Sequence, residues 1–450
     1  MTDKLLEKGS IAEIGAAYRA KTLTIAEATG WYLKRIAALN PELNAVKEVA
    51  PRAMEEAKLA DVELAAGRDR GPLHGIPVLL KDNIFTADGM ACSAGAKALA
   101  GFKPQREATL VRRLREAGAI VLGKTNLTEF ADFVSDVMPS EFSGAGGVVR
   151  NPHGIRYDRG QGSSVGSAAA VAASLAPVAI GSETQNSIQT PASYSGVVGY
   201  KPSVDLVDCE GVVPLVPSQD TPGPLARSVE DAALVAAILA GAAPRALETI
   251  DPKKPRLGVP RKHVAEHPSF ACVLERLAKA GITLVDPCDF PSATELHEVR
   301  SSVFRTEFKA ALNALLKDNG APCGIGSMAE LIAWNEAHPD AIPYGQSLLI
   351  AANATAGLDD PTYKADRARD IELSRTRGID AALAQHKVDA LIAPMGACAK
   401  ATGKAGAPVV AVPCGMDETG NTPFGVTVFS AGGTDASLLA VAAAVERAAA

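Results

Sequence analysis

Short apolar runs recur between longer helical segments, and this alternation limits the possible folds more than any other feature of the sequence. The runs are four to six residues long and lie at 76–80, 119–122, 257–260, 390–394 and 408–413. Runs of this length between turn residues are typical of buried strands. Strands that alternate with helices predict an α/β fold, in which helices sandwich a mixed, mostly parallel sheet. The 450 residues suffice for one large α/β domain or two ordinary ones.

The segments between the runs show which parts are helix and which are loop. Helices are expected at 24–37, 51–66, 106–117 and 435–449. The stretch 143–166 is rich in Gly, Ser, Arg and Asn and lacks periodicity, which predicts a long loop. Long loops inside compact domains are often functional. The region from about 245 to 385 contains the most helix and the fewest motifs.

Composition excludes several classes of partner. The formal net charge is -6 and the basic residues are scattered, which disfavours nucleic acid. No apolar stretch is long enough to span a bilayer, and the N-terminus lacks the apolar core of a secretory signal. The cysteines are odd in number, far apart and without a CxxC pair: 92, 209, 272, 288, 323, 398 and 414. A cytoplasmic protein with reduced cysteines, no membrane contact and no structural metal is therefore expected.

Two segments match well-known motifs without the context that those motifs need. Residues 118–125, GAIVLGKT, fit the phosphate-binding pattern GxxxxGK[ST]. Their apolar centre predicts a buried strand rather than a loop around phosphate. Residues 162–166, GSSVG, fit the GxSxG pattern with Ser164 as nucleophile. That pattern needs a preceding strand and a later Asp and His, whereas loop precedes it here and His338 and His386 lie in polar settings.

Three other segments together carry the residue types for serine chemistry. They are GIPVLLKDNI with Lys81, GQGSSVGSAAAVAA with Ser163, and GSETQNSIQTPAS with Ser187, 24 residues after Ser163. A serine hydroxyl becomes a good nucleophile only when a base removes its proton. Lysine is a base only when neutral, and burial beside an apolar strand lowers its pKa. A second serine can relay the proton between the two.

These segments resemble, in order and spacing, the motifs of the amidase-signature family. The resemblance is good over 5–240 and weaker over 389–430, about 60% of the chain. It implies a single domain over 1–450, with core motifs at 70–205 and a variable pocket region at 245–385. It also implies Ser187 as nucleophile, Ser163 as relay and Lys81 as base, with a cis peptide bond between Gly162 and Ser163. The oxyanion hole would be formed by the backbone N–H groups of four consecutive residues: Thr184, Gln185, Asn186 and Ser187. The resemblance implies no cofactor and no metal.

The sequence also departs from the family pattern near the expected nucleophile. Gln185 and Asn186 replace the usual glycine pair, Gln189 stands where many members have arginine, and Val165 replaces a glycine. Asn tolerates left-handed backbone angles, so Asn186 could substitute for one glycine. Gln185 could narrow the pocket or bind a polar substrate, or the pair could impair the oxyanion hole.

The resemblance leads to three functional hypotheses. The first is a stand-alone hydrolase that cleaves the C–N bond of a small amide through an acyl-serine. Esterase activity and a homodimer are compatible with this hypothesis. The second is an amidotransferase-type subunit that makes ammonia for a partner, and the third is a degenerate member that binds ligands without turnover. Pocket walls are expected from 125–145 and 290–385, with these candidate residues: Phe133, Met138, Phe142 and Tyr344.

Overall fold

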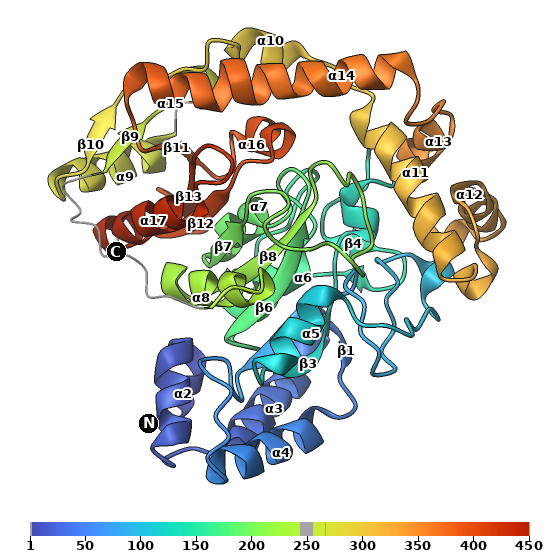
Figure 1. The fold of residues 1–450 in the computed structure, drawn as a ribbon, viewed down its shortest axis with the longest axis vertical. Helices are drawn as coiled ribbons and strands as arrows, with labels where there is room; N and C mark the ends of the chain where they lie inside the picture. The colour runs from blue at the N-terminus through green and yellow to red at the C-terminus, as the bar shows by residue number, and fades with distance from the viewer. Residues whose placement is uncertain (1, 244–254, 266, 450) are drawn as a thin grey trace.

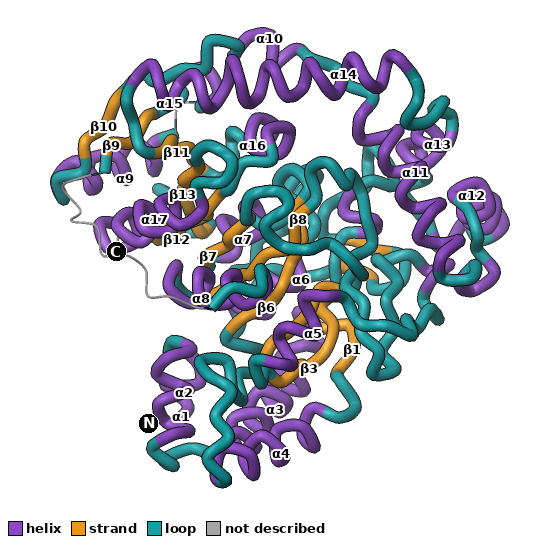
Figure 2. Tube along the Cα trace, viewed as in Figure 1, coloured by secondary structure: helices purple, strands orange, loops and turns teal. Residues whose placement is uncertain are grey.

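One eleven-stranded sheet runs through the middle of the protein, with helices on its outer sides (Figures 1 and 2). The computed structural model describes residues 2–243, 255–265 and 267–449. Residues 245–254, the start of the expected pocket region, lie outside the described residues. The strands in sheet order are β1 (Val46–Val49), β3 (Ile120–Thr125), β2 (Pro77–Lys81), β6 (Val178–Glu183), β8 (Thr221–Ala226), β7 (Val198–Lys201), β12 (Val409–Met416), β13 (Pro423–Phe429), β11 (Ala390–Pro394), β9 (Arg256–Gly258) and β10 (Thr283–Val285).

The predicted α/β class, with a mixed sheet between helices, is confirmed. Parallel pairing occurs toward the two ends of the sheet, along β3, β2 and β6 and along β11, β9 and β10. The central strands from β6 to β11 pair antiparallel, as does β1 with β3 at one edge. Parallel pairing is therefore less extensive than the alternation of helix and strand predicts, because segments such as β12 and β13 are joined by a turn, not by a crossover helix.

The helices begin and end close to where periodicity places them. The expected helices at 24–37, 51–66, 106–117 and 435–449 are found as α3 (Ile25–Leu43), α4 (Ala53–Ala65), α5 (Thr109–Glu116) and α17 (Asp435–Ala449). Helix α3 starts where it does because Thr24 and Glu27 form a reciprocal capping box. It runs beyond 37, and Pro41 lies inside its last turns.

The remaining helices divide into three groups. The N-terminal ones are α1 (Thr2–Lys8) and α2 (Ile11–Arg19). The central ones are α6 (Val165–Ala172), α7 (Gln189–Ser195) and α8 (Val229–Leu239). The C-terminal ones are α9 (Pro268–Lys279), α10 (Ala293–Glu298), α11 (Val303–Asp318), α12 (Met328–Ala337), α13 (Ser347–Asn353), α14 (Pro361–Ile371), α15 (Asp380–His386) and α16 (Ala399–Ala405). Figure 1 shows α14 arching over one side of the molecule, between α10 and α13.

The predicted long loop is present and leads directly to α6. Within 143–166 the only regular elements that the structure describes are parts of a short hairpin, β4 (Phe142–Ser143) and β5 (Gly147–Val148), and the first residues of α6. Helix α6 starts at Val165 and is buried along nearly its whole length, which its small side chains permit. The loop therefore delivers Ser163 to the interior of the protein.

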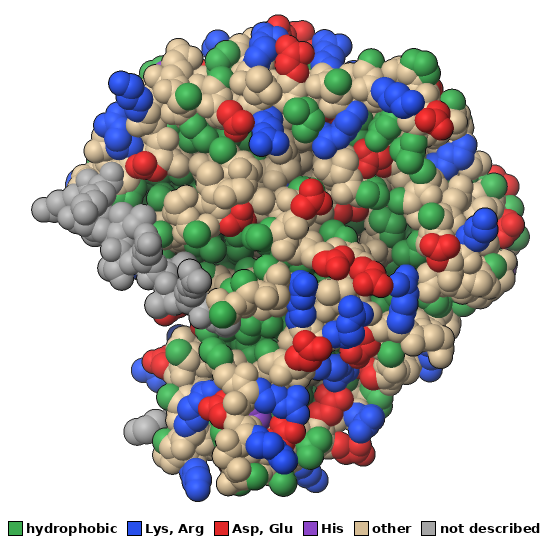
Figure 3. Space-filling model, in the orientation of Figure 1, with side chains coloured by type: hydrophobic (Ala, Val, Ile, Leu, Met, Phe, Trp, Pro, Cys, Tyr) green, Lys and Arg blue, Asp and Glu red, His purple; other side chains and the backbone are tan. Residues whose placement is uncertain are grey.

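The described residues show how charges, apolar helices and cysteines are distributed. Acidic and basic side chains are interspersed over the face drawn in Figure 3, with no continuous basic band across it. Among the described residues, no helix combines the length and apolarity needed to cross a membrane. Within the same residues, no cluster of three or more His, Cys, Asp or Glu side chains is placed to hold a metal. All seven cysteines are free thiols.

Candidate active site

Lys81 ends strand β2 and its side chain is completely buried. The Nζ atom donates hydrogen bonds to Ser163 Oγ at 2.7 Å, to Ser182 Oγ at 3.0 Å and to the Ser182 carbonyl at 3.2 Å. Burial lowers the pKa of Lys81 to about 7, although nearby carboxylates, with Asp220 the strongest, act in the opposite direction. A substantial share of this lysine is therefore neutral at neutral pH, as a general base requires.

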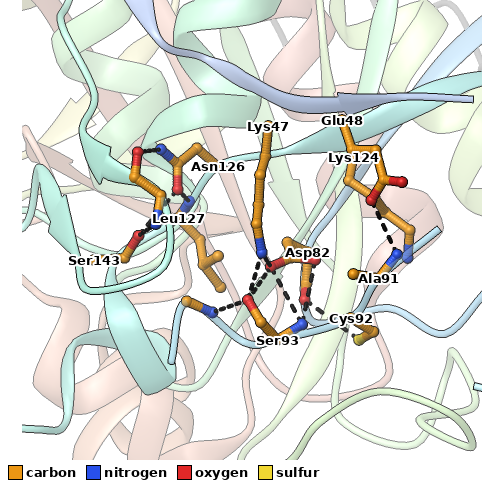
Figure 4. Close-up of polar contacts among 12 residues, drawn as sticks. Lys47, Glu48, Asp82, Ala91, Cys92, Ser93, Lys124, Asn126, Leu127 and Ser143 are labelled. Atoms are coloured by element: carbon orange, nitrogen blue, oxygen red, sulfur yellow. Dashed lines mark hydrogen bonds and ion pairs between the residues drawn. The ribbon is translucent and has the colours of Figure 1, made fainter. Parts of the chain in front are cut away.

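Asp82 follows Lys81 in the sequence but belongs to a separate network (Figure 4). Its carboxylate accepts from Lys47 Nζ at 2.5 Å and from Ser93 Oγ at 2.6 Å. Lys47 also donates to Ser93 Oγ at 2.5 Å. Lys47 comes from β1, which reaches this place because β1 and β2 both pair with β3. The nearest carboxylate in the sequence is thus neutralised by a different lysine, so Lys81 is not held charged by it.

We expect Lys47→Met to destabilise the protein by about 3–5 kcal/mol, because it leaves the buried Asp82 carboxylate without its cation. The side chains of Lys47 and Asp82 are 15% and 0% exposed, so solvent cannot replace the lost partner. Urea unfolding measures the change. The control is Lys364→Met, which breaks an exposed ion pair to Asp359 and should change stability little. Equal losses of unfolding free energy in the two variants would show that the buried pair matters no more than an exposed one. Recovery of stability in the double variant Lys47→Met/Asp82→Asn would support the cost of the unpaired carboxylate.

Ser163 lies at the end of the long loop, and the position before it, Gly162, requires a glycine. Gly162 has a φ of +89°, and an added Cβ would lie 2.6 Å from Pro191 Cδ and 2.8 Å from the Asn186 carbonyl. The expected cis bond between Gly162 and Ser163 is not found, since the described residues contain one cis peptide, Asp286–Pro287. Before a residue other than proline, the trans peptide bond is favoured by about 3 kcal/mol. The chain changes direction here through the positive φ of Gly162 and not through a cis bond.

Ser187 lies in the turn that joins β6 to α7, and it is 4% exposed. Glu183, the last residue of β6, shapes this turn from inside. Its carboxylate accepts from the N–H of Ile188 at 2.6 Å and from the N–H of Gln189 at 2.9 Å. Gln189 Nε2 donates to the same carboxylate at 2.6 Å, so the side chain at this position supplies a neutral donor to Glu183.

The backbone of the turn fits an anion-binding role. Among the described residues, the N–H groups of Gln185, Asn186 and Ser187 have no hydrogen-bond acceptor. Neither Gln185 nor Asn186 has a positive φ. Asn186 therefore does not adopt the left-handed conformation that asparagine tolerates. Asn186 Nδ2 donates to the Gly160 carbonyl at 2.5 Å, which ties the turn to the long loop. Two non-glycine residues are thus accommodated, and unpaired donors remain.

The structure brings some of the predicted site residues into contact and not others. Lys81 binds Ser163, and the N–H of Ser164 donates to the Ser187 carbonyl at 3.0 Å. Within the described residues, no hydrogen bond joins the hydroxyls of Ser163 and Ser187. Such contacts are often loose in enzymes without substrate. Thr184 uses its hydroxyl to bind Asp220, which places it beside the turn.

Sequence reasoning missed the supporting residues of this site. Glu183 lies in the segment GSETQNSIQTPAS, where it is a lone acid among small and apolar residues at the end of a buried strand, and this pattern could have identified it. Ser182 also belongs here, since its hydroxyl accepts from Lys81 and from Asn83 Nδ2 at 2.9 Å. Lys47 carries no local signal, because its role depends on strand pairing.

The two motif matches without context have structural roles. Residues 120–125 form the buried strand β3, and Lys124 donates to the Ile84 carbonyl. Ser164 directly precedes α6, and its hydroxyl donates to the Ser182 carbonyl at 3.1 Å, inside the protein. His338 lies near the surface and contacts the Trp334 carbonyl. The predicted buried strand is thus confirmed, and His338 lies in the polar setting expected for it.

Two adjoining cavities flank the turn. One of ≈ 590 Å³ is lined by Gln185 and Asn186 together with parts of the 131–136 and 299–305 segments. The other, ≈ 350 Å³, is largely apolar and reaches Ser182 and Thr184. Of the four candidate wall residues, Phe133 lines the larger cavity. Met138 is 2% exposed within the core, while Phe142 packs edge-on against Tyr344 with ring centroids 5.1 Å apart.

A buried lysine bound to a serine, beside a turn with unpaired N–H groups, is the arrangement that the sequence resemblance implies. The Amidase family model matches residues 27–405, and that match covers most of the chain. The chain belongs to the amidase family. It is accordingly a hydrolase that acts on amide C–N bonds.

Individual relatives of this amidase show how far the similarity extends. A probable amidase of Arabidopsis thaliana is 34% identical over 98% of this chain and 90% of its own length. The crystal structure of the peptide amidase from Stenotrophomonas maltophilia is 40% identical, with a TM-score of 0.88 over 97% of this chain and 96% of that one. A glutamyl-tRNA(Gln) amidotransferase subunit from Acidothermus cellulolyticus is 43% identical, but over only 56% of this chain and 48% of its own. The two amidases are thus similar over nearly their full length, and the amidotransferase subunit over about half of its own.

Proposed function

We propose that this amidase cleaves small amides through an acyl-enzyme on Ser187, with Ser163 as proton relay and Lys81 as base. The observation that carries the proposal is the 2.7 Å hydrogen bond from the buried Lys81 Nζ to Ser163 Oγ. A lysine with a pKa of about 7 can hold the proton of a serine relay at neutral pH. The free N–H groups of Gln185, Asn186 and Ser187 support the second requirement, a site for the oxyanion.

The proposed reaction proceeds through two acyl-transfer steps. Neutral Lys81 takes a proton from Ser163 as Ser163 takes one from Ser187, and Ser187 Oγ bonds to the amide carbon. The tetrahedral oxyanion binds the free N–H groups of the turn. Its collapse breaks the C–N bond, and the proton returns through Ser163 to the leaving nitrogen. Water then attacks the acyl-Ser187 ester with the same pair as base, which releases the acid and restores Ser187.

The substrate that we propose is a small-molecule amide, cleaved without a cofactor or a partner chain. The peptide amidase of Stenotrophomonas maltophilia is similar over nearly its full length, so amides of short peptides belong in the test set. The cavity beside Gln185 and Asn186, at ≈ 590 Å³, has the size of a typical small-molecule site.

Ammonia release from a panel of primary amides tests this function. The panel contains aliphatic amides, amino-acid amides and dipeptide amides, each incubated with the purified chain alone. We expect ammonia from at least one class without added metal, nucleotide or protein. A folded chain that releases nothing from any class by itself would contradict a stand-alone amidase and favour a partner-dependent subunit or a binding protein.

Glu183→Gln should lower kcat by about 10²-fold, the value of one oxyanion donor, with little effect on KM. The variant keeps the size of the side chain. It replaces a carboxylate that accepts three hydrogen bonds with an amide that has only one acceptor oxygen, which disturbs the turn that carries Ser187. Steady-state kinetics on the best panel substrate measure it. The control is Glu446→Gln, which alters a glutamate that accepts from the Val229 N–H, outside the turn. A kcat that stays within twofold of wild type in Glu183→Gln would refute this role.

A further inference from the structure

The cavity beside the turn has an uneven charge. Its lining includes five cationic side chains and two acidic ones: Arg159, Arg300, Arg305, Lys400 and Lys404 against Asp132 and Asp136. Two of the cations already have carboxylate partners. Arg159 lies 3.7 Å from Asp136, and Lys404 forms a buried ion pair with Asp370 at 2.5 Å. The positive excess therefore resides in the other three groups.

Arg300 and Arg305 form the unpaired part of this wall. Within the residues that the structure describes, neither guanidinium has a hydrogen bond or an ion pair. Arg300 comes just before α11 and Arg305 lies in its first turn, so one segment presents both. Ser301, between them, donates to Asp370 at 2.8 Å, which fixes this segment to α14. Two arginines on a fixed backbone, open to one cavity, are suited to an anion.

Lys400 reinforces the same wall from α16. Its Nζ atom donates to the carbonyls of His297 and Val299, at 2.9 and 3.1 Å, and so holds the residue before Arg300 in place. Burial lowers the pKa of Lys400, and the positive charges of Lys404 and Arg300 lower it further. The local potential is therefore positive, and a bound anion would relieve the repulsion among these groups.

We propose that this cavity binds a carboxylate carried by the amide substrate at the end remote from the scissile bond. The inference rests on the proposed function, because Gln185 and Asn186 line the same cavity and connect it to the acyl-transfer site. Each free guanidinium can bind a carboxylate through two parallel hydrogen bonds. The substrate class is thus an amide with a free terminal carboxylate.

Binding to the Ser187→Ala protein tests the carboxylate without relying on turnover. Isothermal titration calorimetry compares glutaramate with 5-methylhexanamide, which has the same shape but no charge, and repeats the comparison with succinamate, adipamate and their neutral isosteres. We expect the carboxylate ligand to bind at least tenfold more tightly at one chain length. The preference should disappear in Arg300→Gln/Arg305→Gln and persist in Arg68→Gln, an exposed arginine outside the cavity.

The possible outcomes separate this inference from the proposed function. Equal binding of charged and neutral ligands at every length overturns the carboxylate site, and so does a preference that survives in the double variant. Neither result affects ammonia release by the wild type, which tests the amidase function separately. Conversely, a preference that depends on the two arginines supports the site even when the wild type cleaves none of these ligands.

Discussion

Ser187→Ala is expected to reduce amide hydrolysis by about 10⁴-fold or more, because without the hydroxyl no acyl-enzyme can form. The turn, its free N–H groups and both cavities remain, so substrate binding should survive. The measurement is kcat/KM for ammonia release, together with the Kd for the same amide. A large fall in kcat/KM with an unchanged Kd is the expected combination.

A buried serine on the neighbouring helix gives a matched control for Ser187→Ala. Ser193 lies on α7, is fully buried and donates to the Gln189 carbonyl at 2.9 Å. Ser193→Ala removes one local hydrogen bond and should leave kcat/KM within a few-fold of wild type. Comparable losses in the two variants would mean that packing around α7, and not a nucleophile, explains the effect of Ser187→Ala.

Lys81→Ala should reduce kcat/KM by about 10³- to 10⁴-fold, the upper part of the range for a general base. The wild type should also show a pH dependence set by the pKa of about 7. Below that pH the lysine is protonated and cannot accept a proton, so kcat/KM should rise with pH through about 7 and then level off. Lys81→Ala should lose this rise along with the activity.

The same lysine makes a second contribution that stability measurements can detect. Its pKa is about 7 in the folded chain and about 10.4 in an unfolded one, so the unfolded state binds more protons between these values. Below pH 7 the cost of burying the protonated amine is fully present, and it declines as pH rises from about 7 to 10. The free energy of unfolding of the wild type, relative to Lys81→Met, should increase over that window. A difference that is independent of pH would contradict the lowered pKa.

Local patterns in the sequence located several of the helices and strands, whereas the family resemblance, and not a local pattern, pointed to Ser163 as the partner of Lys81. The run before Lys81 is apolar at every position, and a fully buried strand needs just that. The capping residues of α3 mark its start in the sequence. The order of strands was less accessible, because pairing of distant segments such as β7 with β12 depends on the whole fold.

The parts of the site that were not predicted depend on contacts between distant residues. The Lys47–Asp82 pair joins residues 35 positions apart, and it exists because β3 brings β1 and β2 together. The wall formed by Arg300, Arg305 and Lys400 combines two segments about one hundred residues apart. Each of these residues alone looks like an ordinary surface cation.

Covalent labelling by a fluorophosphonate probe, followed by mass mapping of the modified peptide, tests whether Ser187 is the nucleophile. The probe forms a stable bond with the hydroxyl of an activated serine, so it reports the nucleophile independently of the substrate. We expect a single modified residue, Ser187, with labelling that is lost in Ser187→Ala and greatly slowed in Lys81→Ala. Modification of Ser164, persisting in Ser187→Ala and lost in Ser164→Ala, would contradict the assignment and point to the GxSxG serine instead.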